Sequence, residues 1–274
     1  MTAVVLLHSS ASSGAQWRSF AERQGARYRV VAPDLYGYGS APNWGGSGPF
    51  RLEHEAEAVL AVIERLEGPV HLVGHSYGGA VALHLAASHA RLLRSLTLIE
   101  PVAFHLLEDR SGIAGVAGRV AQALASGDYE GGMAQFVDYW TPNAWNALTA
   151  ARRSAMAARI GKVALDFYAS FNEPARAADL RELALPTLIL RGSDSPLPAQ
   201  RICELLARVL PAARLETLEG AGHMCPLTHA DAVNRLIAAH IEAVQLREVS
   251  DGHAEDRLDF TGGARRGLRQ LAGA

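Results

Sequence analysis

The pentapeptide 74–78, Gly-His-Ser-Tyr-Gly, combines residue types and a spacing that could do chemistry. It follows the apolar run 70–73 and precedes a helical pattern over 80–87, which is the strand, sharp turn and helix that a G-x-S-x-G motif requires. The glycines allow a tight turn, because larger side chains there would collide with neighbouring elements. The turn would lift the Ser76 hydroxyl above the sheet and aim the first amides of the helix at any charge that develops beside it. The pattern predicts a nucleophilic serine.

A serine hydroxyl is a poor nucleophile unless a base that works near neutral pH lies within hydrogen-bond reach. The chain has 11 histidines, and His223 is the one whose position fits best. The tetrapeptide 220–223, Gly-Ala-Gly-His, follows a predicted strand over 214–218. We therefore expect His223 on a loop at the carboxyl edge of the sheet, the same edge that carries Ser76.

Short apolar runs alternate with longer helical patterns along the chain, as in a parallel sheet covered by helices on both faces. Apolar residues recur at helical spacing from Leu52 to Leu66 and predict one such covering helix, and a last helix is expected from about Pro226 through Ile241. The fold class is therefore α/β, with a mostly parallel, doubly wound sheet. The expected strands span 3–8, 28–32, 70–74, 95–99, 187–191 and 214–218.

One long stretch breaks this alternation. Residues 101–186 contain Ala-rich and aromatic helical patterns and no convincing strand, so we expect a helical cap inserted into a core formed by 1–100 and 187–247. Such a cap lies over the carboxyl ends of the strands, where open parallel sheets bind ligands. The segment 248–274 shows little periodicity and is expected to be a flexible tail. Four aromatic residues of the cap could line a substrate pocket or simply form core: Trp140, Trp145, Phe167 and Phe171.

Composition excludes several classes of function. The 274 residues carry 26 basic and 28 acidic side chains, a formal net charge of −2, so nothing favours a nucleic-acid partner. No apolar run approaches the roughly 18 residues of a membrane span and no charged leader is present, so we expect a soluble, cytoplasmic protein. Cys203 and Cys225 are expected to be buried thiols, because they have neither a disulfide framework nor the paired spacing of a zinc site. Composition does not define an oligomeric state.

Several independent motifs together resemble the α/β-hydrolase fold family over roughly residues 4–241. The segment 7–13 looks like that family's oxyanion loop, and 33–39 looks like its Asp-x-x-Gly-x-Gly loop. By this resemblance, the backbone amides of Ser10 and Tyr77 would hold the oxyanion. The chain begins at what resembles the third strand of the family, which implies a sheet without the usual first two strands and with a different edge.

Two carboxylates are alternatives for the acid that orients His223. In this family the acid often lies three residues after the glycine that ends the strand before the final one, but that position after Gly192 holds Ser195, and Asp194 lies one residue early. Some members of the family supply the acid from the end of an earlier strand, where this chain has Glu100. Either could stabilise the imidazolium, and we place Asp194 slightly ahead of Glu100.

The resemblance implies a serine hydrolase that cleaves small, apolar carboxylic esters through an acyl-enzyme on Ser76, with no cofactor. A serine nucleophile argues against the dehalogenase and epoxide-hydrolase members, which place an aspartate there. Hydrolysis of a carbon–carbon bond or a lactone by the same triad is the alternative among hydrolases. A cofactor-free oxygenase, and a ligand-binding scaffold without catalysis, are the alternatives from other classes.

Overall fold

The computed structural model describes residues 1–267, with side chains described through residue 250. Its centre is a six-stranded sheet in which every neighbouring pair is parallel, with the strand order β2-β1-β3-β4-β5-β6. All six expected strands are present, and β2 forms the edge of the shortened sheet. The strands are β1 (Ala3–Leu7), β2 (Arg29–Val31), β3 (Val70–His75), β4 (Leu93–Ile99), β5 (Thr187–Gly192) and β6 (Ala213–Leu218).

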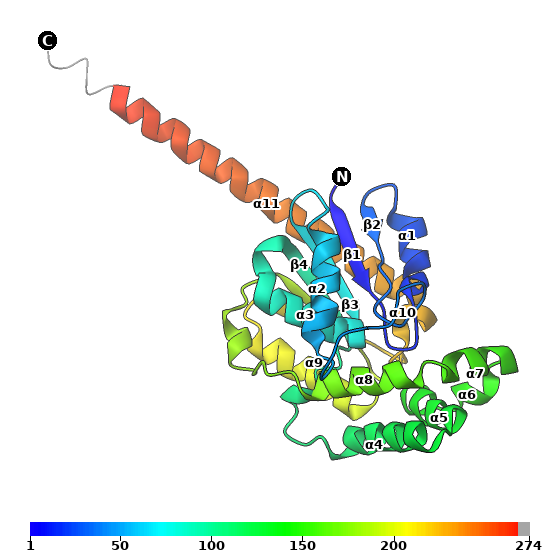
Figure 1. Cartoon of the computed structure of the whole chain (residues 1–274). Coiled ribbons are helices and arrows are strands. Elements are labelled where there is room, and N and C mark those ends of the chain that lie inside the picture. The colour runs from blue at the N-terminus through cyan, green and yellow to red at the C-terminus, as the bar shows by residue number, and fades with distance from the viewer. Residues whose placement is uncertain (268–274) are drawn as a thin grey trace, which may run out of the picture.

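Helices cover both faces of the sheet (Figure 1). Successive strand side chains point to opposite faces, so the unbroken apolar run of β1 needs cover on both sides. Val5 and Leu7 pack in the larger core with α2 (Leu52–Ile63), α3 (Tyr77–His89) and α9 (Leu197–Val209). Val4 and Leu6 pack in a second core with α1 (Arg18–Gln24) and the start of α11 (Ala230–Gly267). The doubly wound α/β arrangement predicted from the sequence is confirmed.

Residues 101–186 form a helical insertion with no strand, as expected. The chain leaves the sheet after β4 and returns at β5, and the inserted helices gather at one end of the sheet (Figure 1). The larger core runs without a break from Leu98 of β4 to Ile113 and Val163 of the insertion. A boundary between two separate domains therefore stays a prediction. The inserted helices are α4 (Ser111–Ser126), α5 (Tyr129–Trp140), α6 (Ala144–Ala147), α7 (Ala150–Ala157) and α8 (Ile160–Phe171).

The last helix is longer than the sequence pattern suggests. The short helix α10 (Cys225–Thr228) precedes it, and α11 continues through Gly267, extending away from the other elements in Figure 1. Part of the expected flexible tail is thus described as helix, while residues 268–274 lie outside the described residues; its flexibility stays a prediction. None of the described helices is long and apolar enough to cross a membrane. The cytoplasmic location stays a prediction.

Candidate active site

Ser76 lies at a sharp turn between the end of β3 and the start of α3. Its backbone φ of 55° and ψ of −117° form a strained conformation that residues with a side chain rarely adopt. A Cβ on Gly74 would lie 2.3 Å from the carbonyl oxygen of Gly78, and a Cβ on Gly78 would lie 2.5 Å from that of His8. Both distances are shorter than real Cβ contacts. The motif therefore needs both glycines, as the sequence predicted.

A continuous chain of hydrogen bonds links Ser76, His223 and Glu100. The Ser76 Oγ lies 2.9 Å from His223 Nε2, and His223 Nδ1 lies 2.6 Å from Glu100 Oε2. All three side chains are at most 5% exposed. Because a carboxylate can only accept, the imidazole donates from Nδ1 and leaves Nε2 free to accept the serine proton. This polarity gives His223 the geometry of a general base.

The Glu100 carboxylate has two further donors. Its Oε1 accepts from the backbone N–H of Gly192 at 2.6 Å and from the hydroxyl of Ser195. Burial raises the pKa of Glu100, but His223 and these two donors outweigh burial and leave the pKa below its ordinary value. Glu100 is therefore held as the charged partner that an imidazolium needs.

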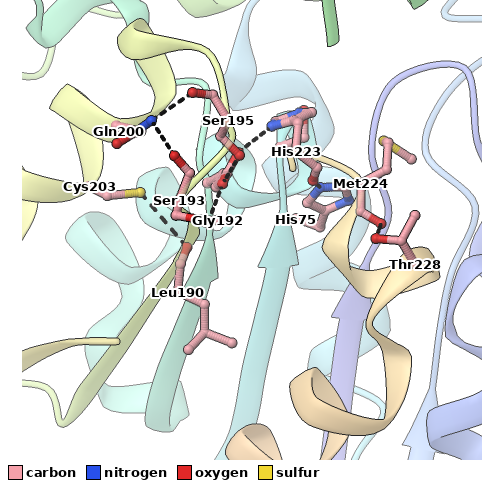
Figure 2. A network of polar contacts seen from close by, with 12 residues as sticks. His75, Leu190, Gly192, Ser193, Ser195, Gln200, Cys203, His223, Met224 and Thr228 are labelled. Carbon is pink, nitrogen blue, oxygen red and sulfur yellow. Dashed lines mark hydrogen bonds and ion pairs between the residues drawn. The ribbon is translucent and has the colours of Figure 1, made fainter. Parts of the chain in front are cut away.

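The end of β5, at Gly192, and the loop that follows it, with Ser195, supply these donors. In Figure 2, Gln200 of α9 spans this loop, and its Nε2 donates to the carbonyl oxygens of Ser193, at 3.2 Å, and Ser195, at 2.7 Å. A Cβ on Gly192 would lie 2.0 Å from the carbonyl oxygen of Ala221, so no larger residue fits there. The part played by Ser195 was not predicted from the sequence. The available signal was a hydroxyl at the position where the family often has its carboxylate.

The structure separates the two candidate acids. Asp194 is exposed, and its Oδ1 accepts from the hydroxyl of Ser193 at 2.9 Å, whereas His223 Nδ1 bonds to Glu100. Its backbone N–H donates to the carbonyl of Ala221, which fixes it in the turn. Glu100, the second choice from the sequence, is the carboxylate beside His223.

The two backbone N–H groups expected to hold the oxyanion, those of Ser10 and Tyr77, have no hydrogen-bond partner among the described residues. Tyr77 is the first residue of α3, so its amide belongs to a helix N-terminus that favours negative charge. The Ser10 hydroxyl donates to Asp166 Oδ2 at 2.6 Å and so anchors its own loop to the insertion. Within the described part of the chain both amides are therefore without another partner, and their role as oxyanion donors stays a prediction.

The loops around Ser10 are built by buried polar side chains. Ser9, which replaces the usual glycine of this loop, donates to Gln16 Oε1 from its N–H at 3.2 Å and its hydroxyl at 3.1 Å. His8 donates from Nδ1 to the Ser9 carbonyl and accepts at Nε2 from the Leu35 N–H. Burial lowers the pKa of His8 to about 4. These bonds shape the loop and account for His8 structurally.

A buried ionic cluster joins the insertion to the core. Lys162 of α8, the only lysine in the chain, pairs with Asp166 one turn on and lies 2.9 Å from Glu55 Oε1 of α2. The Tyr38 hydroxyl also donates to Asp166 Oδ2, at 2.6 Å. Burial raises the pKa of both carboxyls, and the charge of Lys162 offsets part of that effect. This cluster holds Asp166 against the oxyanion loop.

Trp140 of α5 stacks on the His223 ring, with centroids 3.9 Å apart and planes at 25°. His75 at the end of β3 lies close to His223, with ring centroids 5.1 Å apart, and its Nε2 donates to the His223 backbone carbonyl at 2.9 Å (Figure 2). Burial, followed by repulsion from His223, lowers the pKa of His75 to about 3, so His75 stays neutral. The imidazole of His223 is thus fixed by contacts from both the insertion and the core.

Two cavities meet at Ser76, with volumes of about 20 Å³ and about 330 Å³. Trp140 lines both, and Phe167 lines the small one. Trp145 and Phe171 are not among the residues that line either cavity. Phe171 packs on Phe104, and Trp145 is buried in the core. For these two residues, core packing is therefore the alternative that applies. Within the described residues, no cluster of three His, Cys, Asp or Glu side chains could hold a metal ion.

With this fold and site, the chain matches the alpha/beta hydrolase family over residues 4–236 and belongs to it. It is 33% identical over 256 residues to a pimeloyl-[acyl-carrier protein] methyl ester esterase of Neisseria meningitidis serogroup C, covering 88% of this chain and 94% of that protein. The same enzyme of Aeromonas hydrophila is 30% identical, over 82% of this chain and 90% of that protein. These relatives agree with the expectation of an ester-bond hydrolase.

The fold is likewise shared with known structures. The crystal structure of a hydrolase from Pseudomonas aeruginosa superposes with a TM-score of 0.74 and 25% identity, over 88% of this chain and 90% of that one. The fold, the family match and the esterase relatives therefore all agree with an alpha/beta hydrolase.

Proposed function

We propose that this protein is a serine carboxylesterase in which Ser76 is the nucleophile, His223 the general base and Glu100 the acid of the triad. The observation that carries the proposal is the unbroken hydrogen-bond chain from Ser76 through His223 to Glu100. Asp194 is exposed and bonded to Ser193, so we give it no part in the triad. The esterase relatives support the choice of an ester over other acyl compounds.

In this mechanism, the Ser76 Oγ attacks the ester carbonyl while its proton passes to His223 Nε2. The oxyanion is held by the amides of Ser10 and Tyr77, donors of a kind worth about 3 kcal/mol each in the transition state. The imidazolium, stabilised by Glu100, gives the proton to the leaving alcohol. Water activated by His223 then attacks the acyl-enzyme and releases the acid.

The test compares wild type with Ser76→Ala on p-nitrophenyl acetate, followed by intact-mass measurement after treatment with a serine-directed phosphonate. We expect turnover and a single adduct for wild type and neither for Ser76→Ala, because the variant lacks only the nucleophilic oxygen. Circular dichroism of both proteins controls for folding. Turnover at the wild-type rate by Ser76→Ala would refute the mechanism.

The same experiment separates the alternatives. A single adduct without ester turnover would indicate an activated serine that cleaves a different bond, as in carbon–carbon or lactone hydrolysis. Neither turnover nor adduct would indicate a binding scaffold.

A further inference from the structure

We infer that the site takes esters with a very short acyl group and a large apolar alcohol. This inference rests on the proposed function, since it assigns the two cavities at Ser76 to the two halves of an ester. Four residues line both cavities and so mark where they meet: Ser10, Ser76, Phe136 and Trp140.

The chemistry at Ser76 decides which cavity holds which half. In the tetrahedral intermediate, the oxyanion points to the Ser10 and Tyr77 amides. The leaving oxygen must lie near His223 Nε2, which gives it a proton. His223 lines the large cavity and not the small one. The alcohol therefore occupies the large cavity, and the acyl carbon takes the remaining direction, into the small one.

The volumes then set the sizes of the two groups. A volume of roughly 10–15 Å³ on this measure holds one water-sized group. The small cavity, about 20 Å³, therefore has room for little more than the methyl group of an acetyl ester. The large cavity, about 330 Å³, lies within the range of roughly 300–1,000 Å³ that is typical of small-molecule sites.

The walls of the small cavity oppose a longer chain. Phe104 and Phe167 both line this cavity, and their rings stack with centroids 6.0 Å apart. Asp166 is 3% exposed and is held by Ser10, Tyr38 and Lys162, so it has no freedom to turn away. An alkyl chain extended in this direction would have to displace an aromatic ring or lie against a buried carboxylate, which is costly.

The large cavity has the opposite character. Its walls are mainly apolar, and they come from the insertion and from the segment after His223, which brings in Met224 and Leu227. The named substrate of the relatives is a methyl ester, whose alcohol is the smallest there is. In this chain the larger cavity is the one assigned to the alcohol and the smaller one is assigned to the acyl group. We therefore infer a different substrate.

The experiment uses two isomeric esters, hexyl acetate and methyl heptanoate, which have the same atoms and nearly the same hydrophobicity. Released acid is titrated at constant pH with the wild-type protein. Because a single ill-fitting methylene changes kcat/KM by about 10- to 200-fold, we expect hexyl acetate to be preferred by at least about 100-fold. Equal or reversed preference, with Ser76 still labelled by phosphonate, would overturn this inference alone. No turnover of either ester and no adduct would overturn the proposed function as well.

Enlarging the small cavity tests its assignment directly. Phe167→Ala should raise kcat/KM for methyl heptanoate and reduce the preference by at least about 10-fold. The milder Phe167→Leu should shift it in the same direction if the alanine variant does not fold. The matched control is Tyr168→Ala, which truncates the neighbouring aromatic residue on α8; Tyr168 is 45% exposed and does not line either cavity. An unchanged preference in folded Phe167 variants would contradict the acyl assignment.

Discussion

At the scale of single residues, the central feature is the environment of His223. The imidazole has an acceptor on one side, Glu100, a donor on the other, Ser76, and a tryptophan ring across its face. Glu100 itself has φ of 43°, a strained backbone conformation for a residue with a side chain. Strain of this kind persists where the surrounding structure fixes it, and here β5 does so, since the Glu100 N–H donates to the Leu190 carbonyl.

The two candidate acids give opposite expectations on mutation. Glu100→Gln keeps the shape but removes the charge that stabilises the imidazolium, so kcat should fall by roughly 10⁴-fold, by analogy with the serine protease triad. Asp194→Asn is the matched control and should leave kcat within about twofold, because Asp194 is exposed and bonded to Ser193. Steady-state kinetics with p-nitrophenyl acetate measures both. A large loss in Asp194→Asn with little change in Glu100→Gln would reverse the assignment.

At the scale of elements, polar contacts between α8 and the core hold the insertion against the loop that carries Ser10. Lys162 and Asp166 lie one turn apart on α8, so both reach the same point, where Glu55 of α2 and the Ser10 loop meet them. The rings of Tyr38 and Tyr77 also face the Lys162 Nζ, at 4.7 and 4.6 Å from their centroids. This cluster fixes the insertion over the oxyanion loop.

Removing the lysine tests this connection. Lys162→Met leaves two buried carboxylates without their cation, and we expect a loss of about 3–5 kcal/mol of stability, since breaking a buried ion pair strands its partner. The midpoint of thermal unfolding should fall by at least about 6 °C. Arg152→Met on α7, an exposed position of the same insertion, is the control and should change the midpoint little. A shift below about 2 °C for Lys162→Met would show that the cluster adds little stability.

At the scale of the whole molecule, buried histidines make stability depend on pH. His8, His71 and His240 have pKa values lowered to about 4, and His75 to about 3, in each case mainly by burial. In the unfolded chain their ordinary pKa is about 6.5. Below that pH the unfolded state therefore binds more protons than the folded state, so stability falls as the pH drops from about 6.5 toward 4.

The free energy of unfolding is expected to change steeply with pH. Four protons taken up on unfolding correspond to about 5 kcal/mol per pH unit near pH 5. Urea unfolding at pH 7, 6 and 5, under reversible conditions, measures it. His71→Gln removes one of these protons, so the free energy of unfolding should change less steeply with pH, by about 1.4 kcal/mol per pH unit. A free energy of unfolding that stays constant from pH 7 to pH 5 would contradict the assignment of these histidines as neutral and buried.

The sequence by itself determined the features whose signal is local. The four central strands, β1, β3, β4 and β5, are mainly buried runs, and all six strands are bounded by turn residues. Two glycines specify the turn at Ser76, and His223 lies in the loop that follows the end of β6 at Leu218. These patterns depend on neighbours in the chain, so the six strands, the helical insertion and the pair Ser76 and His223 could be found without a structure.

The tertiary structure decided what depends on residues far apart in the chain. Glu100 and His223 are separated by 123 positions, and their contact depends on the backbone at Glu100 and on the loop at Gly192 and Ser195. Strand periodicity could not rank Glu100 above Asp194, because both follow a strand end where a loop sets the side-chain direction. The two cavities are likewise made by side chains of the insertion packing over Ser76, and packing of that kind leaves no periodic trace in the sequence.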